Sequence, residues 1–220
     1  MKLDSYRCLI SNLPIRQQAF TSQLTTWSKR MEPLPAALED IFGGNQEVTL
    51  SRDDLFSLAG ARAIPRIVYA VILWGYPKGM RGNHFPNIVG AMAQIEAILT
   101  EIRQDGNQIP DWDEHWNNTF GQANGENRVA GLGLSTYSKI LYFMNIRANG
   151  KKCLILDQVL IDVFSSRKFD EFAHLAGITY TTAPNLYSTY LDSMESESLR
   201  LGVTPDQLEM FLFMFGSVLK

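Results

Sequence analysis

The chain has 220 residues, enough for one globular domain with a sizeable hydrophobic core. Hydrophobic residues make up 45% of it and charged residues 20%, which excludes the composition of an intrinsically disordered protein. The net charge is −3, and two cysteines are too few for a disulfide framework, a four-cysteine zinc site or an iron–sulfur cluster. We therefore expect a single domain over residues 1–220, with no metal and no cofactor.

The N-terminal residues 1–13 contain Asp4, Arg7 and Asn12 and lack the continuous apolar core of a signal peptide. The apolar runs of the chain are all much shorter than the roughly 20 residues of a membrane span. We expect a cytoplasmic protein that is monomeric and does not associate with membranes.

Helical spacing of apolar residues dominates along the chain, so we predict an all-α fold. A first helix is expected over residues 16–31, closed by Pro33 and Pro35 because proline has no amide to donate inside a helix. A second helix is expected over residues 51–59, which Gly60 then breaks or bends. Residues 64–75 predict a buried helix, although their valines and isoleucines leave a strand as the alternative.

Residues 76–86 are rich in glycine and proline and predict a loop, which Lys78, Arg81 and His84 make basic. An amphipathic helix follows over residues 87–103.

Residues 105–126 contain glycine, asparagine and proline and predict the longest irregular region of the chain. We expect a hinge here between two helical lobes of the domain.

The segment that carries chemistry begins after Gly131 and Gly133, where residues 135–138 precede an apolar run. Serine and threonine are typical of helix starts, so Lys139 is expected in the first turn of a helix. A lysine buried beside the positive end of a helix has a lowered pKa, because both surroundings disfavour its charged form. The neutral amine that results is the form a lysine nucleophile requires.

Asn149 and Gly150 are expected to end this helix, and Lys151 and Lys152 follow them. An apolar segment over residues 153–156 then leads into Asp157, which precedes helical spacing over residues 158–165. Asp157 is therefore predicted to cap that helix and to place its carboxylate opposite the Lys139 amine.

This order of a turn, a lysine, an apolar helix, a basic turn and an aspartate, within residues 131–164, resembles the helix-hairpin-helix DNA glycosylase superfamily. It is most similar to the bacterial and archaeal 8-oxoguanine DNA glycosylase branch with the OGG fold. The resemblance implies a two-lobed helical fold in which Lys139 attacks the sugar C1′ and Asp157 stabilises the sugar cation and assists proton transfer.

The chain departs from that family at the hairpin before the lysine, where Ser135, Thr136 and Tyr137 replace glycine, an aliphatic residue and glycine. Those glycines let the backbone approach a DNA phosphate. Either Tyr137 prevents this docking, or Gly131 and Gly133 provide it from slightly further back.

Other residues are assigned by position. Phe143 is expected to line a base pocket or to belong to the core, and residues 206–215 resemble the final helix that closes the pocket, with Gln207, Phe211 and Phe215. The expected DNA contacts come from a stretch without acidic residues, 127–156: Gly131, Gly133, Ser135, Tyr137, Arg147, Lys151 and Lys152.

The function implied by the resemblance is base excision: removal of a damaged or modified purine, similar to 8-oxoguanine, from double-stranded DNA with the base flipped out of the stack. Strand cleavage at the abasic site (AP lyase activity) can accompany it. The alternative is a nucleic-acid- or nucleotide-binding effector of a bacterial anti-phage defence system that keeps the fold and has altered catalysis.

Overall fold

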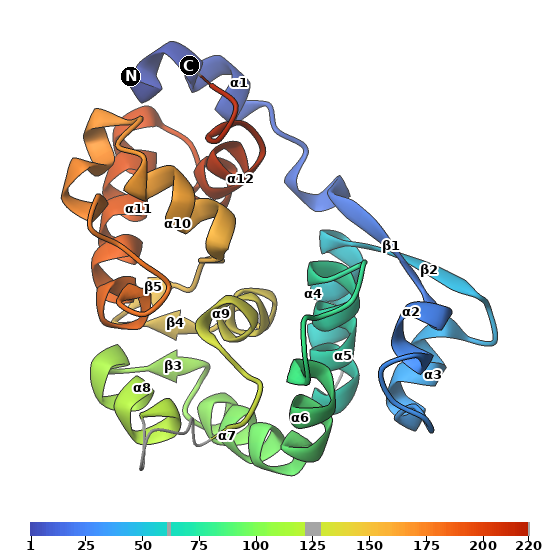
Figure 1. The fold of residues 1–220 in the computed structure, drawn as a ribbon. Coiled ribbons are helices and arrows are strands. Elements are labelled where there is room, and N and C mark those ends of the chain that lie inside the picture. Colours follow the sequence, from blue (N-terminus) through green and yellow to red (C-terminus); the bar gives the residue numbers. More distant parts are fainter. Residues whose placement is uncertain (61–62, 122–128, 220) are drawn as a thin grey trace.

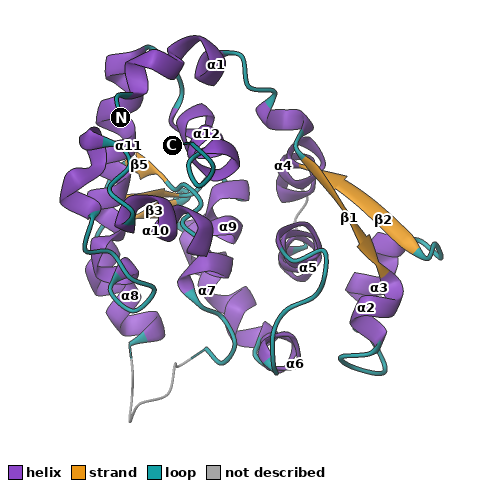
Figure 2. Ribbon diagram, turned by 45° about the horizontal axis from the view of Figure 1, so that its top comes forward, coloured by secondary structure: helices purple, strands orange, loops and turns teal. Residues whose placement is uncertain are grey.

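The computed structural model describes residues 1–60, 63–121 and 129–219. Helices dominate this part of the chain, and two small sheets accompany them (Figures 1 and 2). The predicted all-α class is therefore correct only in outline. None of the described helices is long and apolar enough to cross a membrane.

The N-terminal segment packs against the last helix of the chain (Figure 1). The elements involved are the 3-10 helix η1 (Leu3–Tyr6), α1 (Arg7–Ser11) and α12 (Pro205–Phe215). The Gln207 side chain donates a hydrogen bond to the Ser11 carbonyl, and the Arg200 guanidinium lies 2.8 Å from the Asp4 carboxylate. The beginning and the end of the chain are therefore held together.

A two-stranded antiparallel sheet replaces part of the first predicted helix. Its surroundings are η2 (Ile15–Gln17), β1 (Ala19–Gln23), α2 (Leu24–Ser28) and β2 (Glu47–Ser51). Ala19 pairs with Ser51, and the Thr21 and Thr49 hydroxyls lie 2.7 Å apart across the ladder. The prediction of one helix over residues 16–31 is wrong, because pairing with a distant strand decides the conformation and a local pattern does not contain it.

Helix α5 forms the centre of the fold and packs against α3, α4 and α9. The helices of this region are α3 (Ala36–Phe42), α4 (Arg52–Gly60), α5 (Ile64–Gly75), α6 (His84–Gly90) and α7 (Met92–Gln104). Every residue of α5 from Ile67 to Trp74 is buried, which confirms the predicted buried helix. The helix expected over residues 87–103 is divided at Ala91, whose backbone is not helical.

A three-stranded sheet follows, in the order β3–β4–β5. Its strands and neighbouring helices are β3 (Gln108–Ile109), α8 (Trp112–Phe120), α9 (Leu134–Phe143), β4 (Arg147–Ala148) and β5 (Lys151–Lys152). The prediction that residues 105–121 are irregular is wrong, because β3 and α8 lie within them. Asp111 caps α8 and accepts a hydrogen bond from the Glu114 amide. Residues 122–126 lie outside the described residues, and the hinge between two lobes stays a prediction.

The remaining elements are α10 (Gln158–Ser165), η3 (Asp170–Leu175), η4 (Ala183–Leu186) and α11 (Tyr187–Leu201). Helix α9 lies between α5 and α10 in both views of the fold (Figures 1 and 2). Side chains of α9 can therefore reach both the N-terminal helices and the start of α10.

Candidate active site

Lys139 is buried in the second turn of α9, with 4% of its surface exposed. The helix begins after Gly133, which is its N-cap. The predicted position in the first turn is wrong, because the chain enters the helix before Ser135 and no serine or threonine side chain caps it.

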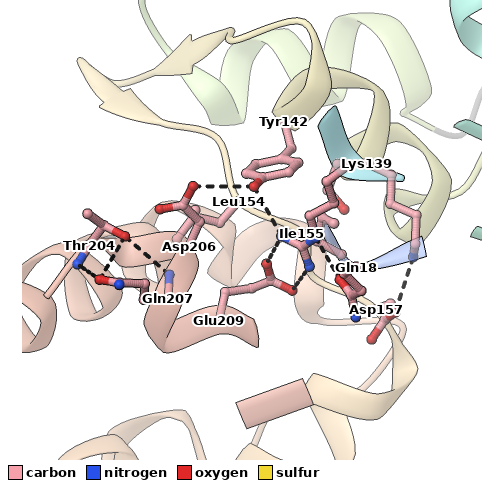
Figure 3. A network of polar contacts seen from close by, with 12 residues as sticks. Gln18, Lys139, Tyr142, Leu154, Ile155, Asp157, Thr204, Asp206, Gln207 and Glu209 are labelled. Carbon is pink, nitrogen blue, oxygen red and sulfur yellow. Dashed lines mark hydrogen bonds and ion pairs between the residues drawn. The ribbon is translucent and has the colours of Figure 1, made fainter. Parts of the chain in front are cut away.

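Asp157 caps α10, as predicted, and pairs with the lysine (Figure 3). One carboxylate oxygen, Oδ1, accepts hydrogen bonds from the amides of Val159 and Leu160. The other, Oδ2, lies 3.2 Å from Lys139 Nζ. The Ser138 hydroxyl accepts a hydrogen bond of 3.1 Å from the Leu156 amide, so α9 also holds the segment that leads into Asp157.

The Lys139 ammonium has three hydrogen-bond partners: the Ser135 carbonyl, the Ser135 hydroxyl and the Asp157 carboxylate. Burial on its own would lower the pKa of this amine. The charge and hydrogen bond of Asp157, together with Tyr76 and Glu209, outweigh burial, so the pKa of Lys139 lies above its ordinary value. The expected lowering of the pKa is therefore wrong for this state, and the amine must give up a proton before it can act as a nucleophile.

The end of α5 forms a notch for the lysine side chain. A methyl group on Gly75 would lie 3.0 Å from Lys139 Cδ, so a larger residue there would push the lysine chain out of this position by a few tenths of an ångström. Next to it, the Tyr76 ring lies below the ammonium, 5.5 Å from Nζ, and the Tyr76 hydroxyl hydrogen bonds with Ser135 and Thr136. Gly75 and Tyr76 therefore fix the direction of the Lys139 side chain.

A cavity of about 200 Å³ lies beside the Lys139–Asp157 pair. Its walls are aromatic, apolar and charged: Phe20, Arg52, Trp74, Gly75, Pro77, Lys139, Ile155, Asp157, Glu209 and Phe213. The volume is below the ~300–1,000 Å³ of pockets for drug-sized ligands, so the cavity suits a small planar group. Among the described residues, no group of three or more acidic, histidine or cysteine side chains could hold a metal ion.

A second buried ion pair faces this cavity. Arg52 and Glu209 are each 1% exposed, and their closest atoms, Nη1 and Oε2, lie 2.9 Å apart. Arg52 also donates hydrogen bonds to Gln18 and to the Tyr142 hydroxyl. Burial raises the pKa of Glu209 above its ordinary value even with Arg52 beside it. Figure 3 shows Glu209, Gln18 and Tyr142, the three hydrogen-bond partners of Arg52, next to Lys139 and Asp157.

Sequence reasoning missed the Arg52–Glu209 pair, although both residues left a signal. Glu209 is an acid inside the apolar run from Leu208 to Phe215, where a charge needs a partner. Arg52 is a cation in the first turn of α4, which is an unfavourable place for positive charge.

The residues expected in the base pocket lie elsewhere. Phe143 packs behind the cavity against Trp74 and Phe56. Gln207 forms a capping box with Thr204 at the start of α12. Phe211 packs against Tyr6, Phe169 and Phe215. Phe143, Gln207, Phe211 and Phe215 are thus absent from the described lining of this cavity.

The basic side chains expected at DNA have partners within the protein. The Arg147 guanidinium donates to the Gly150 carbonyl. The Lys151 ammonium lies 2.5 Å from the Asp192 carboxylate, and that of Lys152 lies 3.0 Å from Asp206.

The segment before α9 borders a second hollow, of about 530 Å³. Its lining combines aromatic, basic and small residues: Tyr76, Gly79, Met80, Arg81, His84, Gly131, Gly133, Ser135, Thr136, Gln158 and Tyr180. Ser135 belongs to this hollow and also binds Lys139, so the hollow adjoins the lysine site.

The two glycines of this segment make room for the protein's own atoms. A Cβ atom on Gly131 would lie 2.5 Å from the His84 carbonyl oxygen, and one on Gly133 would lie within 2.5 Å of the Tyr180 hydroxyl. Tyr137, by contrast, is buried and hydrogen bonds with His115 at 2.6 Å. Burial lowers the pKa of His115 to about 4, so this histidine is neutral near pH 7.

Comparison with known proteins gives one family. Searches of curated proteins and of solved structures returned no significant match. A family model described as "Putative 8-oxoguanine DNA glycosylase OGG-like protein" matches residues 13–213, which include Lys139, Asp157 and every residue of the cavity. The chain therefore belongs to the 8-oxoguanine DNA glycosylase OGG-like family.

Proposed function

We propose that this protein is a DNA glycosylase of the helix-hairpin-helix type that removes an 8-oxoguanine-like purine through Lys139 of α9 and Asp157 at the start of α10. The observation that carries the proposal is the buried lysine–aspartate pair, 3.2 Å apart, beside a cavity with aromatic walls. A protein that only binds nucleic acid has no need to bury two opposite charges at a cavity, because burial of charge is costly.

The chemistry follows from the contacts of the two residues. The Lys139 ammonium first loses a proton to water while its partner Asp157 stays ionised, and the neutral amine then attacks C1′ of the sugar. The bond from C1′ to the base nitrogen breaks, and its electron pair leaves with the base, which takes up a proton. Asp157 in its ionised form stabilises the positive charge that develops on the sugar before the new C–N bond is complete.

The same amine accounts for a second activity. Opening of the sugar ring gives an imine between Lys139 and C1′. Loss of a proton from C2′ to water then forms a C2′–C3′ double bond as the C3′–O bond breaks, so the 3′ phosphate leaves and the strand is cleaved. We include AP lyase activity in the proposal for this reason.

The cavity is proposed to hold the flipped base. The rings of Phe20 and Trp74, with centroids 5.3 Å apart, and that of Phe213 offer apolar faces for stacking. Arg52 and Glu209 place a donor and an acceptor at the same cavity, which suits the polar edge of a purine. Since the cavity is small and partly polar, it favours a single base over a whole nucleotide.

The DNA strand is proposed to enter along the second hollow, where Arg81 and His84 supply exposed basic groups beside Ser135. Gly131, Gly133, Arg147, Lys151 and Lys152 stay predicted DNA contacts. Tyr137 is a weaker candidate, because its side chain is buried.

The test is base release from duplexes that contain 8-oxoguanine or another oxidised purine. The wild type should release the base, and Lys139→Gln should abolish release. Asp157→Asn should slow release, although the asparagine side chain still caps α10. Lys29→Gln, on the exposed surface, is the matched control and should behave as the wild type. Release by Lys139→Gln at the wild-type rate would refute the proposal.

A further inference from the structure

Tyr180 is a half-exposed aromatic residue at the entrance to the lysine site. With 50% of its surface exposed, it belongs to a small set of large apolar side chains that face solvent in the described part of the chain: Leu9, Tyr180, Leu199, Met214 and Val218. Tyr180 also lines the hollow beside Ser135 and Tyr76, and both of these residues contact Lys139.

The Tyr180 hydroxyl lies against the start of α9. It occupies the space beside Gly133, the N-cap of α9, where an added Cβ atom would lie within 2.5 Å of the hydroxyl oxygen. The turn that carries the ring is closed by hydrogen bonds between Thr179 and Thr182 in both directions. The closed turn orders the backbone that carries Tyr180, and a tyrosine side chain has only two rotatable bonds, so a ligand that covers the ring costs little conformational entropy.

The rest of the hollow indicates what covers this ring. Arg81 and His84 are exposed on its border and suit a phosphodiester, whereas the exposed part of the Tyr180 ring suits a nucleobase. If a base lies in the cavity and its sugar lies at Lys139, the next nucleotide of the strand must pass through the adjoining hollow. Tyr180 lines that hollow and offers a ring to the base of this nucleotide.

We propose that Tyr180 stacks on the nucleobase next to the flipped nucleotide and holds the strand open at the lysine site. The partner is thus a nucleic acid strand with one base displaced, and recognition at Tyr180 is independent of sequence, since every base has a face on which to stack. This inference rests on the proposed function for its choice of DNA as ligand.

The test uses binding without chemistry. The probes are duplexes with a tetrahydrofuran abasic analogue, which cannot react with Lys139, and with fluorescent 2-aminopurine on its 5′ side in one duplex and its 3′ side in another. Wild-type protein should change the fluorescence strongly on one of the two sides. Tyr180→Ala should remove that change and weaken binding about tenfold, whereas Tyr180→Phe, which keeps the ring, should retain both.

Leu199→Ala is the matched control, because Leu199 is 81% exposed on α11 and does not border the hollow. An unchanged fluorescence response in Tyr180→Ala would overturn the inference, and so would absence of any binding to these duplexes. Failure of the proposed function has a different signature: binding and stacking would be seen, but no base would be released from any lesion duplex.

Discussion

The side chain of Lys139 occupies the space that Gly75 leaves free: a methyl group on Gly75 would lie 3.0 Å from Lys139 Cδ and 3.3 Å from its Cε. The two residues come from α5 and α9, which form the most extensive helix contact around the site. The position of the amine therefore depends on a glycine that has no chemistry of its own.

Gly75→Ala should move the Lys139 amine and slow base release by roughly tenfold, because displacements below 1 Å already impair attack on a fixed substrate. Single-turnover kinetics on lesion DNA would measure this. Gly90→Ala is the control, since Gly90 also ends a helix but has open space around it. Equal effects of the two substitutions would contradict a positioning role for Gly75.

The pH dependence should follow the Lys139 amine. Because its pKa is raised by Asp157, the neutral fraction grows about tenfold per pH unit below that pKa, and the rate of covalent attack should rise from pH 6 to pH 9. Asp157→Asn should shift the rise to lower pH, since the charge that raises the pKa is gone. A rate that falls over this range, or a profile that Asp157→Asn leaves in place, would argue against attack by this amine.

The Lys139–Asp157 pair should also raise the free energy of unfolding, by an amount that depends on pH. A lysine whose pKa is raised on folding stabilises the protein fully below its unfolded value, near 10.5, and the contribution is lost as the pH rises through the folded value. The Lys139–Asp157 pair should thus stabilise the fold at pH 7. Asp157→Asn should lower the free energy of unfolding at pH 7 more than at pH 11, as measured by urea denaturation.

Glu209→Gln should destabilise the protein by about 3–5 kcal/mol, because it leaves the buried Arg52 guanidinium without its counter-ion. The double variant Arg52→Met with Glu209→Leu should recover most of this loss, as no charge is then left unpaired. Both proteins should release the base more slowly than the wild type. A double variant with unchanged base release would show that the pair does not contact the base.

Charge reversal should separate the two candidate DNA surfaces. Arg81→Glu should weaken DNA binding and reduce its salt dependence, because Arg81 is exposed at the hollow beside the site. Lys151→Glu should have a smaller effect, since Lys151 already pairs with Asp192. Fluorescence anisotropy at two salt concentrations would measure both, and the opposite order would favour the surface around β5.

The sequence predicted the parts of the site that depend on local patterns. Asp157 could be identified as a helix cap because an aspartate after an apolar segment and before helical spacing has few other roles. Helices α5, α10 and α12 were predictable for the same reason, since their apolar spacing is regular.

The parts that depend on distant contacts could not be predicted. The β1–β2 ladder joins strands far apart in sequence, and the Arg52–Glu209 pair joins residues 157 positions apart. Burial and helix position alone predict a lowered pKa for Lys139, but the Asp157 carboxylate, itself predicted to face the amine, raises that pKa in the structure. Phe143 is at the right spacing for a pocket, but Trp74 lies in front of it.

Borohydride trapping on lesion DNA tests the central claim most directly. If Lys139 attacks C1′, an imine forms, and reduction should join the wild-type protein covalently to the DNA in a product that denaturing gel electrophoresis and peptide mass spectrometry assign to Lys139. Lys139→Gln should give no such product while it keeps the wild-type circular dichroism spectrum, and Lys29→Gln should trap normally. Trapping of Lys139→Gln with wild-type yield, or a cross-link that maps to another residue, would contradict the account.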